Sequence, residues 1–210
     1  MKVLFAARLV DFKDPLTFVK AACADATQDF QFTVAGDGVL FKECERLAEG
    51  HNNVKLLGWV KQDVVNELMR EADIFCQLSP YENLWAASLI SAMKYGKAVI
   101  CTDVGYVRKY LRADYHVVLI PARNHIALIE AIVKLANDGE LRRMLGENAS
   151  IFVKEKMSLE SVCREIRGML LDVTSVYHLK QFKVELANLY LRGFRIHCNF
   201  NLEVTLPELP

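Results

Sequence analysis

The sequence carries no net charge, because 26 lysines and arginines balance 26 aspartates and glutamates among its 210 residues. Domains that bind nucleic acid normally show an excess of basic residues, so this balance argues against a nucleic-acid partner. The neutral total also gives no sign of a surface that binds acidic membranes, although a local basic patch can hide inside such a total.

Metal-binding motifs are missing as well. The six cysteines (Cys23, Cys44, Cys76, Cys101, Cys163 and Cys198) form no Cys-x-x-Cys pair, and no Asp-x-Asp metal site is found. Zinc is therefore not expected, and no other metal is predicted. Several of the cysteines lie inside apolar runs, where a thiol behaves as a small hydrophobe. We expect a reducing, cytoplasmic compartment.

Long hydrophobic runs are also absent. The N-terminal stretch 1–7 is apolar but far too short for a signal peptide or a membrane span, and we interpret it as a buried strand. No integral membrane segment is expected. Apolar residues make up 52% of the chain and charged residues 25%, which is typical of a soluble protein with a sizeable core. The length suits one α/β domain of good size and is too short for two.

Short apolar runs alternate with segments of helical periodicity. The expected strands are 2–6, 30–35, 54–57, 74–78, 98–101 and 117–120. The expected helices are 16–26, 40–49, 64–71, 87–95, 127–137, 140–155 and 159–173. This alternation is typical of a parallel sheet covered by helices on both faces. The sequence therefore predicts an α/β, doubly wound, Rossmann-like single domain over residues 1–173, with ligands bound at the carboxyl ends of the strands.

Residues 174–210 follow a different pattern. Apolar residues recur at helical spacing from Val176 to Leu189, which indicates an amphipathic helix. Apolar and polar residues then alternate from Ile196 to Leu206, as in a strand with one buried face. This tail either packs on the edge of its own domain or forms an interface. We predict the interface, used for self-association into a homo-oligomer or for docking another domain.

Two cations follow the first expected strand. Arg8 and Lys13 lie in the segment that leads into a helix, where an arginine fork, a lysine charge and the N–H groups of a helix end can together hold an anion. The alternative is that both are ordinary surface cations.

Two other strand ends carry candidate residues. Gly36 and Gly38 follow the second strand and permit a tight turn with close backbone approach, although a purely structural turn explains them as well. Glu82 follows the fourth strand, where its carboxylate can accept hydrogen bonds from sugar hydroxyls while the next backbone amides meet a phosphate. It can equally be a charge that stabilises a helix N-terminus.

In this order, the segments resemble the family 4 retaining glycosyltransferases of the GT-B fold. The resemblance covers residues 1–172 approximately. Its markers are Arg8-x4-Lys13, Ala-Gly-Asp-Gly at 35–38, Gly-Trp-Val at 58–60, Glu82-Asn83, Ser91-Ala92-Met93 and Thr-Asp-Val-Gly at 102–105. The collinear order of these pieces is more specific than any single one.

The resemblance implies roles for individual residues. Arg8 and Lys13 would bind the donor diphosphate and, with Glu82, form the catalytic set. The family's Glu-x7-Glu motif places its first carboxylate near the donor sugar and its second on the ribose hydroxyls. The nucleotide-sugar-binding set would contain Gly36, Gly38, Trp59, Val60, Asn83, Leu84, Trp85 and Ser91. No cofactor is implied, since the nucleotide sugar is the donor substrate.

The sequence departs from the family pattern around the Glu-x7-Glu motif. Ser91 stands where the second glutamate belongs, and Glu82 lies one residue too far from it, with Asn83 at the expected spacing. Ala7 replaces the glycine that usually precedes the arginine. A proline and a glutamate that usually follow Gly105 are replaced by Arg108 and Lys109.

The resemblance implies the donor-binding half of a retaining hexosyltransferase that moves a sugar from a nucleotide diphosphate sugar, such as a UDP- or GDP-sugar, to an acceptor. The expected partners are that nucleotide sugar and the missing N-terminal acceptor domain, or a separate chain in its place. One alternative is a non-catalytic relative that binds a nucleotide or a partner, which Ser91 and the spacing of Glu82 favour. A second is an epimerase or phosphorylase on the same two-domain fold, which the pattern after Ser79 fits less well.

Overall fold

The computed structural model describes residues 1–81, 86–105 and 107–176. The chain divides into two compact units, Met1–Ser158 and Leu159–Pro210. In the second unit the described part is one helix, α8 (Leu159–Val176), close to the helix expected over 159–173. The tail lies outside the described residues from 177 onward, so its strand and its interface stay predictions. No helix within the described ranges is both long and apolar enough to span a membrane.

The first unit is built on a sheet of six parallel strands in the order β3-β2-β1-β4-β5-β6. The strands are β1 (Lys2–Ala6), β2 (Gln31–Ala35), β3 (Val54–Leu56), β4 (Ile74–Gln77), β5 (Ala98–Thr102) and β6 (Val118–Ile120). The order reverses between β1 and β4, which is the switch point of a doubly wound fold. The predicted Rossmann-like α/β fold is confirmed.

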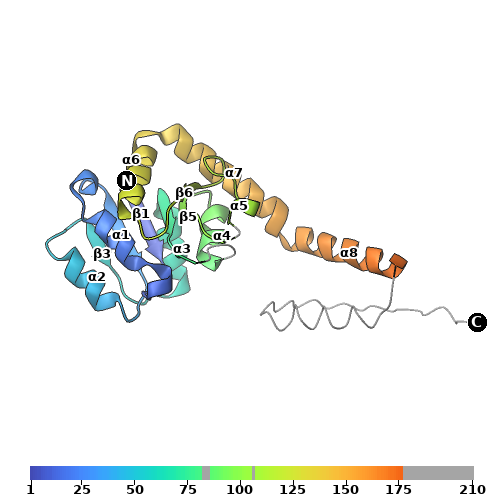
Figure 1. Ribbon diagram of the computed structural model, residues 1–210, viewed down its shortest axis with the longest axis horizontal. Helices are drawn as coiled ribbons and strands as arrows, with labels where there is room; N and C mark the ends of the chain where they lie inside the picture. The colour runs from blue at the N-terminus through green and yellow to red at the C-terminus, as the bar shows by residue number, and fades with distance from the viewer. Residues whose placement is uncertain (82–85, 106, 177–210) are drawn as a thin grey trace, which may run out of the picture. The chain divides into compact units, whose positions relative to one another are not determined.

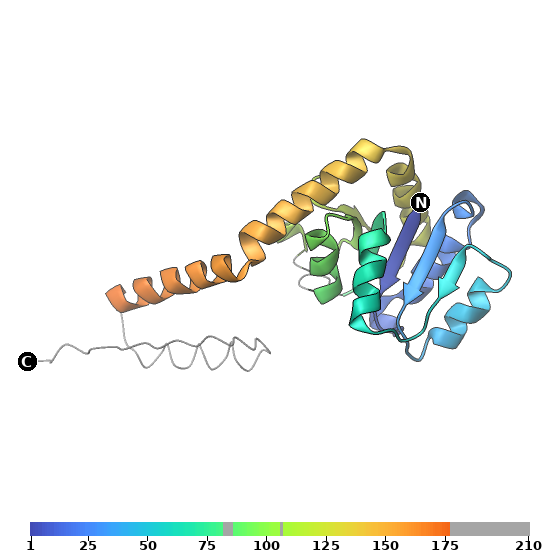
Figure 2. The same ribbon diagram turned by 180° about the vertical axis from the view of Figure 1, so that it is seen from behind.

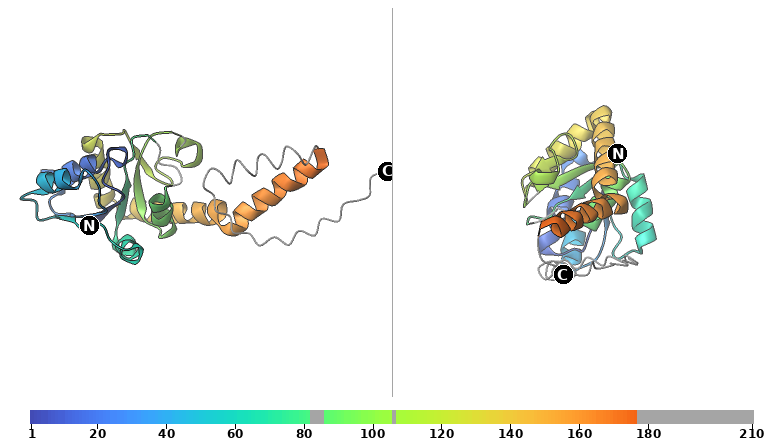
Figure 3. Two further views of the ribbon diagram at one scale, coloured as in Figure 1. Left: turned by 90° about the horizontal axis from the view of Figure 1, so that it is seen from below. Right: turned by 90° about the vertical axis from the view of Figure 1, so that its right-hand side faces the viewer.

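Helices cover both faces of this sheet. They are α1 (Pro15–Ala22), α2 (Phe41–Ala48), α3 (Gln62–Glu71), α4 (Ala87–Lys94), α5 (Val107–Tyr110), α6 (His125–Asn137) and α7 (Gly139–Met157). Helices α1, α2 and α6 pack on one face, and α3 and α4 on the other. Figures 1 and 2 show the two faces in turn, and the end-on view of Figure 3 shows α3 (teal) on the side opposite to α1 (blue).

The central strand shows why the apolar runs are continuous. Val3 and Phe5 of β1 join the core under α1, where the rings of Phe5 and Phe18 lie 5.3 Å apart between centroids. Leu4 belongs to the core on the other face, together with Met69 of α3. Because successive side chains of a strand point to opposite faces, a strand covered on both sides needs apolar residues at every position.

Helix α1 ends earlier than the sequence pattern indicates. The predicted helix over 16–26 stops at Ala22, and Asp25–Thr27 forms a separate short 3-10 turn. Side chains take up the carbonyl groups that a longer helix would have used: the Thr27 hydroxyl donates to the Ala21 carbonyl at 2.6 Å, and the Asn53 amide donates to the Ala22 carbonyl at 2.9 Å. The four-residue α5 was not predicted, because it is too short to show periodicity.

Helix α7 packs against the turn that follows α4 through two glycines. A Cβ atom on Gly146 would lie 2.0 Å from the carbonyl oxygen of Gly96, so the two backbones are in direct contact. Gly96 has a φ of +67°, a left-handed conformation that favours glycine at the end of a helix. The contact fixes α4 against α7.

The described cysteines are free thiols, namely Cys23, Cys44, Cys76, Cys101 and Cys163. Burial raises the pKa of the Cys44 thiol to about 11, with a smaller contribution from the neighbouring Glu43. Cys44, Cys76 and Cys101 are buried and pack as small core residues, whereas Cys23 and Cys163 are partly exposed. The cytoplasmic location stays a prediction.

Candidate functional site

A cavity of about 410 Å³ opens beside the switch point, at the carboxyl edge of the sheet. Its walls come from the segments that follow β1, β2 and β3, from α3, and from the first turns of α4. Pockets that bind small molecules usually have volumes of roughly 300–1,000 Å³, so this cavity is large enough for a ligand.

The structure brings most of the described candidate residues to this one cavity. Its lining includes Arg8, Lys13, Gly36, Trp59, Val60 and Ser91. Gly38 is not part of the lining. Glu82, Asn83, Leu84 and Trp85 lie outside the described residues, and their roles stay predictions.

Arg8 and Lys13 lie near the same aromatic ring. The guanidinium carbon of Arg8 and the Lys13 ammonium nitrogen are each 5.3 Å from the centroid of Phe12. Neither cation has a carboxylate partner within the described part of the chain. Burial, and then the charge of Arg8, lower the pKa of Lys13. An anion bound between the two would relieve this repulsion, so the pair favours an anionic ligand.

The N-terminus of α1 contributes less to anion binding than the sequence predicts. Asp14 holds a left-handed backbone (φ +53°), and its carboxylate accepts a hydrogen bond from the Thr17 amide at 3.4 Å. The next residue, Pro15, has no N–H to offer. Asp14 is buried, its other carboxylate oxygen has no hydrogen-bond partner among the described residues, and burial raises its pKa. A carboxylate therefore already occupies this helix end.

The N-terminus of α4 is open instead. Ala86, Ala87 and Ser88 line the cavity, and no described side chain caps this helix. The first amides of a helix lack intrahelical partners and lie at the positive end of its dipole. The cavity thus has backbone donors from α4 as well as the two cations of the segment after β1.

Neutral polar side chains form another part of the wall, and sequence reasoning missed them. Ser88 lies one turn before Ser91 on α4, and its hydroxyl donates to the buried Gln77 amide oxygen at 3.0 Å. On α3, the Gln62 amide donates to the side-chain oxygen of Asn66 at 3.1 Å, and both residues line the cavity. The i, i+3 spacing from Ser91 is the signal that could have pointed to Ser88.

Gly36 and Gly38 let the loops after β1 and β2 run side by side. A Cβ atom on Gly36 would lie 1.9 Å from the Ala7 carbonyl oxygen, and one on Gly38 would lie 2.4 Å from the Leu9 carbonyl oxygen. The Leu9 amide donates to the Asp37 carbonyl at 2.9 Å across the same interface. Loop packing therefore accounts for both glycines, and Gly36 in addition forms part of the cavity wall.

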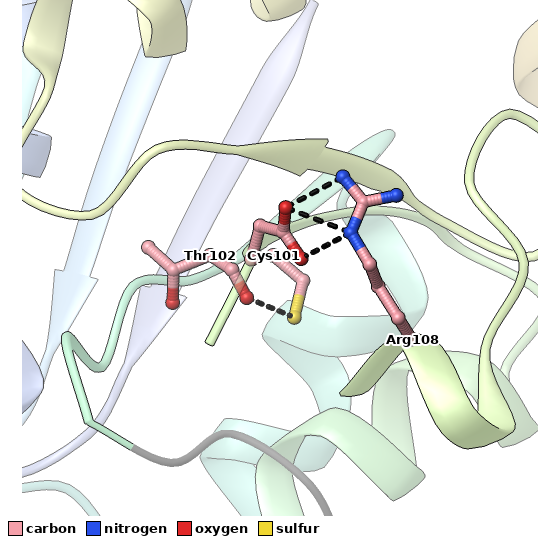
Figure 4. Close-up of polar contacts among 4 residues, drawn as sticks. Cys101, Thr102 and Arg108 are labelled. Atoms are coloured by element: carbon pink, nitrogen blue, oxygen red, sulfur yellow. Dashed lines mark hydrogen bonds and ion pairs between the residues drawn. The ribbon is translucent and has the colours of Figure 1, made fainter. Parts of the chain in front are cut away.

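Arg108, which stands at an unusual position for the resembled family, is not available to the cavity. Its guanidinium holds the carboxylate of Asp103 through contacts of 2.5 to 2.8 Å, as the dashed lines of Figure 4 show. In the same view the Cys101 thiol donates to the Thr102 carbonyl at 3.5 Å. These contacts fix the turn between β5 and α5. Within the described ranges, no group of His, Cys, Asp and Glu side chains is placed to hold a metal.

Comparison with known proteins identifies the family. Residues 1–152 match the family described as Glycosyl transferases group 1. The chain belongs to this family. A similar protein, an uncharacterized glycosyltransferase of Methanocaldococcus jannaschii, is 33% identical over 141 residues, which are 66% of this chain and 40% of that protein.

Two solved structures share the fold. The C-terminal domain of a group 1 family protein from Francisella tularensis superposes with a TM-score of 0.67 at 20% identity, over 75% of this chain and 86% of that domain. HepE from Anabaena, solved with UDP, gives a TM-score of 0.72 at 19% identity, over 82% of this chain and 49% of HepE. The fold is that of the C-terminal half of a GT-B glycosyltransferase. The chain spans 22 to 45% of the length of the curated relatives it matches.

Proposed function

We propose that this group 1 domain is the donor-binding half of a retaining glycosyltransferase that uses a nucleotide diphosphate sugar. One observation carries the proposal: Arg8 and Lys13, with no carboxylate partner within the described part of the chain, share a cavity with the uncapped first turn of α4. Cations and helix-end amides at one cavity are the groups that bind diphosphates.

The cavity offers a place for each part of such a donor. The diphosphate lies between Arg8, Lys13 and the amides of α4. The ribose lies against the hydroxyls of Ser88 and Ser91. Ser91 replaces a carboxylate with a neutral group that can both donate and accept, whereas Ser88 donates to Gln77 and can only accept from the ribose. The base lies along Trp59 and Val60; the Trp59 side chain is exposed and free to cover a flat ring.

The same cations serve the chemical step. When the bond between the anomeric carbon of the sugar and the diphosphate oxygen breaks, negative charge builds on the leaving diphosphate. Preorganised positive groups at that position stabilise the transition state more than the ground state. Arg8 supplies a planar fork that matches two phosphate oxygens, and Lys13 supplies a movable point charge.

We propose a UDP-linked sugar as the donor and a second domain or partner chain as the acceptor-binding half. HepE has been solved with UDP and with UDP-glucose, which supports uridine as the first base to test. Because the chain spans less than half the length of its curated relatives, the acceptor is assigned to the remaining portion of such a protein.

A thermal-shift titration tests this proposal. At a concentration of about 100 times its dissociation constant, UDP should stabilise the domain by ~2.7 kcal/mol, which raises the melting temperature by roughly 5–10 °C. The shift should shrink at high salt, because screening weakens the attraction between the cations and the diphosphate. Uridine, which keeps the base and ribose but lacks the phosphates, should give a much smaller shift. No shift with UDP, GDP or their sugars would contradict the proposal.

Binding of UDP should also weaken as the pH rises through the lowered pKa of Lys13, because only the protonated ammonium attracts the diphosphate. Burial and the charge of Arg8 lower this pKa, so the proton leaves at a lower pH than from an ordinary lysine, whose pKa is ~10.4. Calorimetric titrations should compare the wild-type chain with Lys13→Arg, whose guanidinium stays charged. The ratio of the two affinities cancels the titration of UDP itself. A ratio that stays constant with pH would show that Lys13 does not contact the diphosphate.

A second candidate is a non-catalytic domain that binds the same nucleotide, and Ser91 is the observation that favours it. This residue puts a hydroxyl on α4 at the cavity where the resembled enzymes carry a carboxylate. Both candidates predict UDP binding. They differ in turnover, since only the enzyme releases UDP from UDP-glucose once an acceptor-binding half and acceptor are supplied.

A further inference from the structure

We propose that Arg123 is a positioning residue that fastens the segment carrying Arg8 and Lys13 to the segment that follows β4, and so sets the geometry of the nucleotide-sugar site. The inference rests on the proposed function. It begins from a residue that sequence reasoning did not single out, in the connection between β6 and α6.

The backbone of Arg123 is strained. Its φ is +56°, a left-handed conformation that costs a residue with a Cβ atom about 1–2 kcal/mol. The next residue, Asn124, caps α6 by accepting the Ala127 amide at 3.0 Å, so the chain turns sharply at this point. A glycine would make the same turn without strain. Strained residues of this kind gather at functional sites, and what arginine adds here over glycine is its side chain.

That side chain joins two distant segments. Its Nη2 atom lies 2.7 Å from the Asp11 carboxylate, across 112 positions of sequence, and the guanidinium also lies near the Tyr81 side chain. These contacts, with the one to Asp11 first, raise the pKa of Arg123. Asp11 begins the short turn Asp11–Lys13, which follows one proposed diphosphate ligand, Arg8, and ends at the other, Lys13. Tyr81 belongs to the segment after β4, on the other side of the switch point.

The contacts of Arg123 are too exposed for their contribution to stability to offset the cost of its strained backbone. The side chains of Arg123 and Asp11 are 50% and 68% exposed, and ion pairs of this kind usually contribute about 0–1 kcal/mol. Arg123 is also not part of the cavity lining, so it is not a third ligand of the diphosphate. We infer that Arg123 holds Asp11, and with it the turn that presents Arg8 and Lys13, in register with the segment after β4; its charge also attracts the carboxylate of Asp14, which follows the same turn.

Positioning and simple electrostatics predict opposite results for Asp11. If Asp11 acts only as a negative charge near the diphosphate, Asp11→Asn should tighten the binding of UDP, because a repulsive charge is removed. If Asp11 is the anchor that Arg123 holds, the same change should weaken binding, because the turn between Arg8 and Lys13 loses its attachment.

The experiment measures UDP affinity by calorimetry, and melting temperature, for the wild-type chain, Arg123→Gly, Asp11→Asn and the double variant. Each single change should weaken UDP binding by about 3- to 10-fold, and the double variant should be no weaker than the weaker single one, since both break the same link. The melting temperature of Arg123→Gly should not fall, because glycine adopts the left-handed backbone without strain. The matched control is Asp114→Gly, which removes another exposed ion pair, to Lys134, from another left-handed residue (φ +53°) outside the cavity lining. Its UDP affinity should equal that of the wild type.

Unchanged affinity in Arg123→Gly, tighter binding in Asp11→Asn, or fully additive losses in the double variant would overturn this inference while the wild type still binds UDP. A wild-type chain that binds no UDP would instead overturn the proposed function, and the inference with it.

Discussion

Replacing Arg8 by alanine should weaken UDP binding by about 10- to 150-fold, or ~1.5–3 kcal/mol, the usual range for a hydrogen bond to a charged group. The loss arises because the guanidinium is the only planar fork among the described cavity-lining residues. Arg8 is exposed, and its guanidinium carbon lies 5.3 Å from the centroid of the Phe12 ring, so the fold should lose little stability. Calorimetric titration with UDP, beside thermal melting without ligand, separates the two effects.

Lys20→Ala is the matched control for this change. Lys20 is an exposed cation on the neighbouring helix α1 and lies outside the cavity lining. Its removal should leave UDP affinity unchanged at moderate salt, where charges beyond about 10 Å are largely screened. Arg8→Lys should keep part of the affinity, because it retains the charge but not the fork. If Arg8→Ala binds UDP as tightly as the wild type, the diphosphate does not lie at this residue.

Gly36→Ala should lower the free energy of unfolding by ~2–5 kcal/mol and abolish or strongly weaken UDP binding. The φ of +145° costs an alanine ~1–3 kcal/mol, and its Cβ atom would lie 1.9 Å from the Ala7 carbonyl oxygen, so one loop must move. Ala7 directly precedes Arg8, so the same movement displaces a proposed phosphate ligand. Denaturant unfolding measures the first effect, and calorimetry measures the second.

Gly50→Ala is the control that separates the cost of a positive φ from the steric clash of the new Cβ atom. Gly50 also has a positive φ, +81°, but a Cβ atom there would meet nothing within 4 Å. This change should cost only the ~1–2 kcal/mol of the left-handed backbone and leave UDP binding unchanged. If Gly36→Ala and Gly50→Ala lost the same amount of stability, the loops after β1 and β2 would separate at little cost. That result would contradict their close packing.

The sheet could be predicted from the sequence because strands buried on both faces leave continuous apolar runs, such as residues 3–6. The end of α1 could not be predicted in the same way. The Asn53 side chain donates to the Ala22 carbonyl from 31 positions away in the sequence, and such a contact leaves no local pattern. Local periodicity continued past Ala22 and gave a helix that was too long. Long-range side-chain caps of this kind are the physical reason why helix ends are harder to predict than helices.

For the candidate site, the loops were easier to predict than the helices. Arg8 and Lys13 follow a predicted strand, and the carboxyl ends of parallel strands meet at one edge, so their place was expected. Gln62 and Asn66 were missed because their contribution depends on how α3 crosses the sheet, which the sequence pattern does not specify. The difference between the two helix ends was missed too: the Asp14 side chain caps α1, whereas no described side chain caps α4.

The contact between Gly96 and Gly146 affects where substitutions that impair nucleotide binding are expected in the sequence. With backbone against backbone, no side chain is available to adjust, so α7 and the end of α4 can only move together. The opposite end of the eight-residue α4 forms part of the cavity wall. A bulkier residue at position 146 should therefore shift α4 and weaken nucleotide binding, although the new side chain would not contact the nucleotide. Variants that lose nucleotide binding should consequently map to α7 as well as to the loops around the cavity.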